Sequence, residues 1–129
     1  MHVARRKDAT LTSSVTSAMF TGQVSGAGLS DQSTAKQLFL RLVRFSPGGR
    51  TVWHTHSFEQ GLVIVEGKGI VATEAQENVV EAGDIVIVVP DEKHWHGATE
   101  TTAMAHVAIN GPGETTPMEP VEKIRTQSP

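Results

Sequence analysis

Short runs of β-branched and aromatic residues alternate with turn signals from Phe20 to Asn110, at intervals of about 8–12 residues. No sustained helical period of apolar residues interrupts this pattern. Strands of this length, joined by glycine, proline and acidic turns, are typical of antiparallel sandwiches and barrels. The sequence therefore predicts an all-β fold, an antiparallel β-barrel or jelly-roll sandwich. With 129 residues, the chain is too short to build two well-buried cores.

The turn residues divide the chain into expected segments. We expect residues 1–19 to form a flexible arm, 20–110 the barrel, and 111–129 a Pro/Gly-containing tail that contributes to dimer contacts. Within the tail, 121–125 is read as a helical turn, a strand exchanged with a partner, or loose chain. The expected strands are 20–24, 37–45, 51–55, 61–65, 70–73, 78–81, 85–89 and 102–109, with a hairpin turn at 66–69.

The alternation of side chains in strands also predicts the packing of the larger aromatic residues. Phe39 and Phe45 are expected in the core. Trp53 and Trp95 each precede an inward-facing histidine, so they are expected to pack on the opposite face of the sheet.

The charge balance and composition exclude several classes of function. Eleven Lys and Arg against 14 Asp and Glu leave a net charge of −3, which argues against nucleic acid or an anionic membrane as partner. No apolar stretch reaches the roughly 18 residues of a spanning helix, and no apolar segment of a signal peptide follows the basic residues near the start. The absence of cysteine excludes disulfides and thiolate chemistry. We expect a cytoplasmic protein.

Five of the six histidines lie in three strand-like stretches, as His54 and His56, His94 and His96, and His106. Side chains at positions i and i+2 of a strand point to the same face, so a sheet folded on itself can bring both pairs to one cavity. A single inward histidine is more often a hydrogen-bonded core residue. Two such pairs instead favour a first-row divalent metal, for which neutral imidazole is a suitable ligand.

The same alternation favours Gln60 over Glu59 as the fourth metal ligand. Glu59 is the more usual hard ligand, but it would need a β-bulge that shifts the register by one residue. Three imidazoles and one amide complete the protein's share of the ligands. His96 and His106 are therefore expected to act beside the metal, in hydrogen bonding or proton transfer.

The residues around these histidines resemble the two motifs of the cupin family. The first motif is matched by Gly48, His54, His56, Gln60 and Gly67, with glutamine in place of the usual glutamate. The second motif, from Gly83 to His94, is matched more loosely. The strings at 51–56, 92–98 and 101–109 are similar to small bacterial cupins that include manganese-dependent hydroxynitrile lyases.

This resemblance implies a specific site. His54, His56, Gln60 and His94 would hold one divalent transition metal, with Mn²⁺ favoured and Fe²⁺, Zn²⁺ or Ni²⁺ as alternatives. His96 and His106 would line the pocket, with His96 as the base.

Four neutral ligands leave the full charge of a divalent cation in place, which favours Lewis-acid chemistry over dioxygen activation. We therefore expect a lyase acting on a small hydroxy or carbonyl substrate, most concretely a hydroxynitrile lyase. A cupin oxygenase, a sugar-acid-converting enzyme and a non-enzymatic metal- or ligand-binding cupin are the alternatives. The pocket is expected to be shaped by Val43, Leu62, Ile64 and Ile87, with Arg41 approaching from a neighbouring strand.

Apolar residues on both faces of 62–65 and 85–89 predict a sheet face that needs a cover, hence a homodimer or homotetramer. Imidazole must be neutral to bind metal, so acid is expected to release the metal as the pH falls from about 6 to 5.

Overall fold

One long strand, β7 (Gln60–Thr73), joins the two halves of the fold. Its first part pairs with β11 (Met104–Asn110) on one side and β9 (Ile85–Val88) on the other. Its second part pairs with β10 (His94–Ala98) and β8 (Glu77–Glu81). A computed structural model describes residues 1–14 and 17–126 of the chain. The remaining elements are η1 (Arg6–Asp8), β1 (Thr12–Ser13), β2 (Phe20–Thr21), β3 (Val24–Gly28), β4 (Phe39–Phe45), β5 (Arg50–Thr51), β6 (His54–His56) and β12 (Thr115–Pro117).

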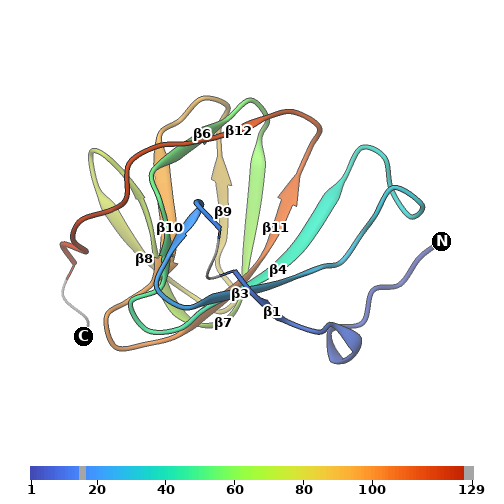
Figure 1. The fold of residues 1–129 in the computed structure, drawn as a ribbon, viewed down its shortest axis with the longest axis horizontal. Coiled ribbons are helices and arrows are strands. Elements are labelled where there is room, and N and C mark those ends of the chain that lie inside the picture. The colour runs from blue at the N-terminus through green and yellow to red at the C-terminus, as the bar shows by residue number, and fades with distance from the viewer. Residues whose placement is uncertain (15–16, 127–129) are drawn as a thin grey trace.

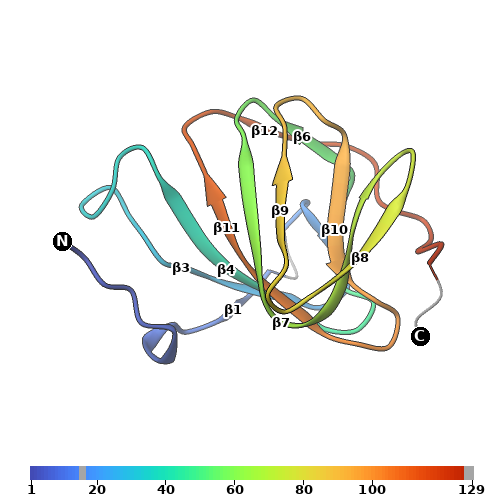
Figure 2. The ribbon, with the colours of Figure 1, turned by 180° about the vertical axis from the view of Figure 1, so that it is seen from behind.

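All strand pairings of the described residues are antiparallel, and the sheet curls around a central core (Figure 1). One half has the order β1-β3-β4-β11-β7-β9, and the other has β8-β7-β10-β5-β2. The reverse view shows β9, β7 and β11 side by side in the first half (Figure 2). β6 pairs with β10 and with β12, and these two short strands cross the open end of the curled sheet. The predicted all-β antiparallel fold is confirmed.

The predicted hairpin at 66–69 is wrong, because β7 continues through it as a single strand. Gly67 has φ +69°, and a Cβ there would lie 2.0 Å from the carbonyl oxygen of Ala103. Gly67 therefore marks a close approach between two backbones, at the point where β7 passes from one half of the sheet to the other. Opposite this bend, the pairing with β11 shifts register between Ala105 and His106.

Two other expected strands are interrupted. The segment 20–24 divides into β2 and the start of β3 at Gly22, whose φ of +79° is not a strand conformation. The segment 51–55 divides into β5 and β6 at Val52 and Trp53. β5 thereby pairs with one end of β10 and β6 with the other, which places β6 across the open end.

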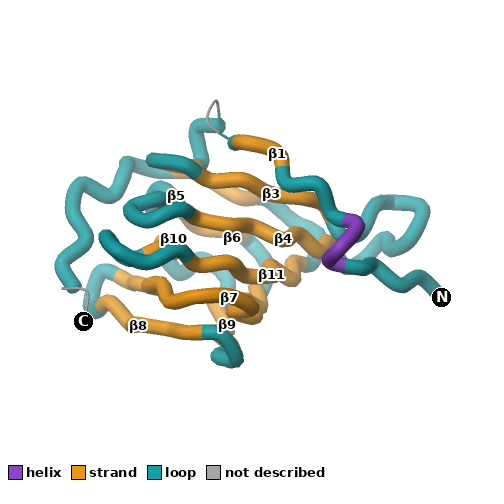
Figure 3. The backbone as a smooth tube through the Cα atoms, turned by 90° about the horizontal axis from the view of Figure 1, so that it is seen from below, coloured by secondary structure: helices purple, strands orange, loops and turns teal. Residues whose placement is uncertain are grey.

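The main core lies between the two halves of the sheet and includes Phe45, Leu62, Ile64 and Met104, all fully or almost fully buried. The prediction that Phe45 lies in the core is confirmed. The same prediction for Phe39 is wrong, since 38% of its surface is exposed at the start of β4. Viewed from below, the strands of both halves curve around this core (Figure 3).

A second, smaller core lies on the outer face of β7 and β10, where Trp95 packs with Ile70, Val121 and Ile124. Trp53 is partly buried against this cluster, so both tryptophans lie on the face expected for them. The segment 121–125 is therefore neither a helix nor a strand in this structure. It covers the tryptophans of its own chain through Val121 and Ile124.

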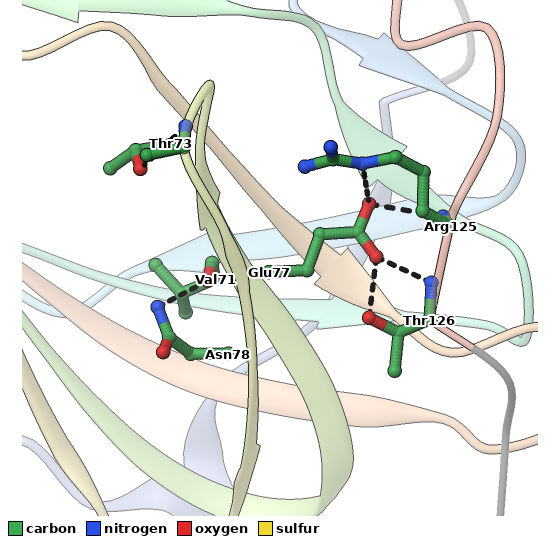
Figure 4. A network of polar contacts seen from close by, with 7 residues as sticks. Val71, Thr73, Glu77, Asn78, Arg125 and Thr126 are labelled. Atoms are coloured by element: carbon green, nitrogen blue, oxygen red, sulfur yellow. Dashed lines mark hydrogen bonds and ion pairs between the residues drawn. The ribbon is translucent and has the colours of Figure 1, made fainter.

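Glu77 fastens this segment to β8 (Figure 4). Its carboxylate accepts hydrogen bonds from the backbone N–H of Arg125 at 3.0 Å and from the backbone N–H and hydroxyl of Thr126 at 2.6 and 2.5 Å. Burial opposes ionisation of the carboxyl, but the hydrogen bonds from Thr126 and Arg125 lower its pKa below the ordinary value. The last described residues are thus held by an ionised, almost fully buried side chain.

Parts of the expected arm and tail contribute short strands. β1 pairs with β3 near the start of the chain, and β12 pairs with β6 after the barrel. The domain boundaries themselves stay a prediction. The described part of the chain has one helix, η1, of three residues, so it contains no helix that could cross a membrane.

Candidate metal centre

Strands β6 and β10 bring three histidines together. His54 and His94 are register partners across these antiparallel strands, and their ring centroids lie 4.2 Å apart. His56, two residues along β6, points to the same side, and its ring lies 4.8 Å from that of His94. One ring nitrogen from each of the three lies within 4.8 Å of the others. This cluster could hold a metal ion.

The local backbone fixes the orientation of all three rings. In each case Nδ1 lies within hydrogen-bond distance of a carbonyl oxygen two residues away. The pairs are His54 with Val52 at 2.8 Å, His56 with Phe58 at 2.9 Å, and His94 with Glu92 at 2.8 Å. A carbonyl can only accept, so a neutral ring carries its proton on Nδ1 and presents the lone pair of Nε2. Ligating histidines are commonly oriented in this way.

Burial favours the neutral form of two of these imidazoles, those of His54 and His94. Burial lowers the pKa of His54 to about 4. Burial, with the neighbouring His54, lowers the pKa of His94 to about 3. The Nε2 of His94 is buried without a hydrogen-bond partner among the described residues, which is costly unless a ligand occupies it. Buried neutral rings that present lone pairs to one another are suited to a cation.

Gln60, the first residue of β7, is buried beside this cluster, with its Oε1 3.1 Å from Nε2 of His56. Its Nε2 donates a 2.8 Å hydrogen bond to Oδ1 of Asn110. In this orientation the amide oxygen and the lone pair of the neutral His56 ring face one another as two acceptors, and a cation between them would satisfy both. Glu59 is exposed, as expected from strand alternation.

His96 and His106 form a hydrogen-bonded pair next to the cluster. Nε2 of His106 lies 2.9 Å from Nδ1 of His96, and both rings are buried against Phe45. Burial, with the nearby His106, holds the pKa of His96 well below its ordinary value. Burial lowers the pKa of His106 to about 4. Nε2 of His96 and Nδ1 of His106 are buried and have no hydrogen-bond partner among the described residues.

His54, His56, Gln60, His96 and His106 line one cavity of about 360 Å³, whereas His94 is not among its lining residues. Val43 and Arg41 of β4 also line it, as expected from the sequence. Leu62 and Ile64 do not. They lie behind the cavity in the main core. The expectation that Ile87 shapes the pocket is wrong, because β9 turns this residue outward and leaves 63% of its surface exposed.

Several residues that line the cavity were not identified from the sequence. They are Met19, Phe20, Thr51, Ala108, Asn110, Thr115 and Pro117. Strand alternation from His106 would have identified Ala108 and Asn110, which face the same side. No sequence signal places Met19 from the expected arm, or Thr115 and Pro117 from the expected tail, at the mouth of a cavity.

A model of the cupin domain, Cupin_2, matches residues 41–110. The chain belongs to the cupin family. This cupin is also 48% identical, over 68 residues, to the (R)-mandelonitrile lyase of Granulicella tundricola, and the match covers 52% of each protein. The chain thus spans about half the length of the curated relative it matches.

Solved structures support the same assignment. A cupin-like protein from Thermotoga maritima superposes with a TM-score of 0.78 at 30% identity, covering 83% of this cupin and 84% of that chain. The polyketide cyclase RemF from Streptomyces resistomycificus has a TM-score of 0.74 at 17% identity, over 97% and 88% of the two chains. The second likeness concerns the fold alone.

Proposed function

We propose that this cupin is a manganese-dependent lyase that cleaves and forms cyanohydrins, a hydroxynitrile lyase. The observation that carries this proposal is that His96, whose buried Nε2 is unpartnered among the described residues, lines the same cavity as His54 and His56 of the three-histidine cluster. A base and a candidate metal site thereby face one small cavity. The partial match to a mandelonitrile lyase supports the choice of substrate.

The proposed ligands are His54, His56, His94 and Gln60, since the lone pairs of the imidazoles and of the amide oxygen fit a cation. The imidazole and amide donors suit Mn²⁺, with Fe²⁺, Zn²⁺ and Ni²⁺ as alternatives. When bound, the ion supplies Lewis-acid stabilisation of negative charge on the substrate oxygen.

His96 would move the proton in this reaction. For its Nε2 to accept a proton, the neutral His96 ring must carry its own proton on Nδ1, which would then donate to Nε2 of His106. Nε2 of His96 accepts the hydroxyl proton of the cyanohydrin as the C–C bond to the nitrile carbon breaks. The electrons of that bond leave with cyanide, the oxygen becomes the aldehyde carbonyl, and His96 then returns the proton to give hydrogen cyanide. His106 holds the tautomer and accepts a hydrogen bond from the protonated His96.

The test measures cleavage of mandelonitrile by protein loaded with Mn²⁺, together with its metal content. His96→Ala is expected to lower kcat by about 100-fold or more, the usual contribution of a general base, and to retain the metal. His94→Ala is expected to lose the metal and the activity together.

His2→Ala is the matched control, since His2 is exposed and lies outside the cavity, and this variant should keep full activity. Full activity of the His96→Ala variant with its metal retained would contradict the assigned role. Oxygen uptake by the Fe²⁺-loaded protein without cyanohydrin cleavage would contradict the proposed reaction.

A further inference from the structure

We infer that the natural substrate of this cavity carries a carboxylate, and that Arg41 binds it. Arg41 is the one Lys, Arg, Asp or Glu side chain among the described residues that line the cavity. No ion pair or hydrogen bond is recorded for its guanidinium within the described part of the chain, whereas Arg44 on the same strand pairs with Glu66. An unpaired guanidinium at a cavity is suited to planar, bidentate recognition of an anion.

The pairing of the strands places Arg41 on the inner face of the sheet. On this face Asn110 and its register partners Gln60 and Phe39 form one row. His106 and its partners Ile64 and Val43 form another row, four residues away along β11. The row between them is formed by Leu62, Ala108 and Arg41. Arg41 therefore lies between the rows that contain Gln60 and His106.

Small side chains keep this region open. Ala108, the partner of Arg41, provides little bulk between it and Gln60. Two strand spacings and one row separate the Cα atoms of Arg41 and Gln60, a distance on the order of 12 Å. The side chains leave room in that span for a small molecule with an anionic group at one end and a hydroxyl or carbonyl group at the other.

Gly26 of β3 makes room for the guanidinium. A Cβ at this buried glycine would lie 2.7 Å from Nη2 and 3.0 Å from Nε of Arg41. The backbone conformation at Gly26 does not require glycine, because its φ is not positive. In the observed conformation the guanidinium therefore lies in the space that a side chain at position 26 would enter, so a larger residue there would move it.

The lining charge favours a carboxylate over a phosphate. The described cavity lining contains no Lys and no second Arg. Among the described lining side chains, one guanidinium balances the single charge of a carboxylate, and no second cationic side chain is available for the second charge of a phosphate monoester. The inference rests on the proposed function only for the reaction that the bound substrate undergoes. Binding of the carboxylate by Arg41 would be the same whichever reaction follows.

The test is a set of binding measurements by isothermal titration calorimetry with 4-formylbenzoate, its methyl ester and phenyl phosphate, on metal-free and Mn²⁺-loaded protein. The ester has the shape of the acid without its charge. We expect the wild-type protein to bind the carboxylate about tenfold or more tightly than the ester, as for hydrogen bonds to a charged group. This preference for the acid over the ester should appear in both the metal-free and the Mn²⁺-loaded protein. Both forms should also bind the carboxylate more tightly than phenyl phosphate.

Arg41→Gln should abolish the preference, and Gly26→Ala should reduce it by displacing the guanidinium. Arg44→Gln is the matched control, on the same strand but on the other face, and should retain the preference. Thermal melting of each variant checks that the fold is intact.

Equal binding of acid and ester by the wild type, or an unchanged preference in Arg41→Gln, would overturn the inference, as would tighter binding of phenyl phosphate. Failure to cleave any cyanohydrin, with the preference present, would contradict the lyase proposal alone.

Discussion

The side-chain amide of Gln60 donates a 2.8 Å hydrogen bond to Oδ1 of Asn110, its register partner across β7 and β11. This bond fixes which end of the Gln60 amide faces His56. Residues that orient a metal ligand commonly change metal affinity by about 10–100-fold when they are replaced. We therefore identify Asn110 as a positioning residue for the proposed metal site.

Asn110→Leu is expected to weaken Mn²⁺ binding by about tenfold, measured by equilibrium dialysis with elemental analysis. Asn110→Asp should retain most of the affinity, because its carboxylate can still accept from Gln60. Asn78→Leu, on the exposed face of β8, is the control. Unchanged affinity in Asn110→Leu would show that Gln60 does not depend on this bond.

The pKa values of the buried histidines predict acid sensitivity of the metal-free protein. In the folded state the pKa of His54 is about 4 and that of His94 about 3, against an ordinary value of 6.5. The unfolded chain therefore takes up protons first as the pH falls. Stability should be complete above about pH 6.5 and decline toward pH 4, by about 1.4 kcal/mol per pH unit for each such group. Urea unfolding at several pH values measures this slope.

The same pKa values change the expectation for metal release. Protons compete for the folded site only near the lowered pKa values, so we expect the folded protein to retain Mn²⁺ to a lower pH than ordinary histidines would allow. Elemental analysis after dialysis at pH 6, 5 and 4 tests this. Complete loss of metal at pH 6 from protein that is still folded would contradict it.

The hydrogen bonds that the Glu77 carboxylate accepts from Arg125 and Thr126 are expected to stabilise the segment that covers the tryptophans. Glu77→Gln replaces a buried, charged acceptor of three hydrogen bonds and should cost about 2 kcal/mol. Unfolding followed by tryptophan fluorescence reports both global stability and exposure of Trp95. Glu74→Gln is the control, because its ion pair with Lys93 is long and its side chain is 69% exposed. Equal effects of the two substitutions would contradict the role of Glu77.

An apolar outer face could form a contact in the expected homodimer or homotetramer. Two rows of register partners cross β4, β11, β7 and β9 on this face. The first row consists of Leu40, Ile109, Gly61 and Ile87. The second row consists of Leu42, Val107, Val63 and Ile85. Ile85 and Ile87 are 67% and 63% exposed. These rows carry no charge, so the face is complementary to a second copy of itself across a two-fold axis. We propose this face as the dimer contact.

Ile87→Glu should convert the dimer into monomers in light scattering at micromolar concentration, because it would bury a charge at the contact. Val79→Glu, a similar change on an exposed residue of β8, should leave the dimer intact. A monomeric wild-type protein would contradict the proposal.

The sequence by itself determined the fold class and pointed to the three histidines that the structure brings together. Strand alternation is a local property, so the side on which His54, His56 and Gln60 point could be read from their spacing. The spacing of turn residues predicted an antiparallel β fold for the same reason. Gln60 could be preferred to Glu59 without knowing which strand lies beside it.

Only the tertiary structure decided how the segments meet. Gly67 has the sequence signature of a turn, but its role as a bend within β7 depends on the backbone of Ala103, far away along the chain. The outward position of Ile87, the bond from Asn110 to Gln60 and the burial of Trp95 under Val121 and Ile124 likewise depend on strand pairing and chain path. Such contacts join residues distant in sequence, and the free energy that selects them comes from burying surfaces together, which no local pattern specifies.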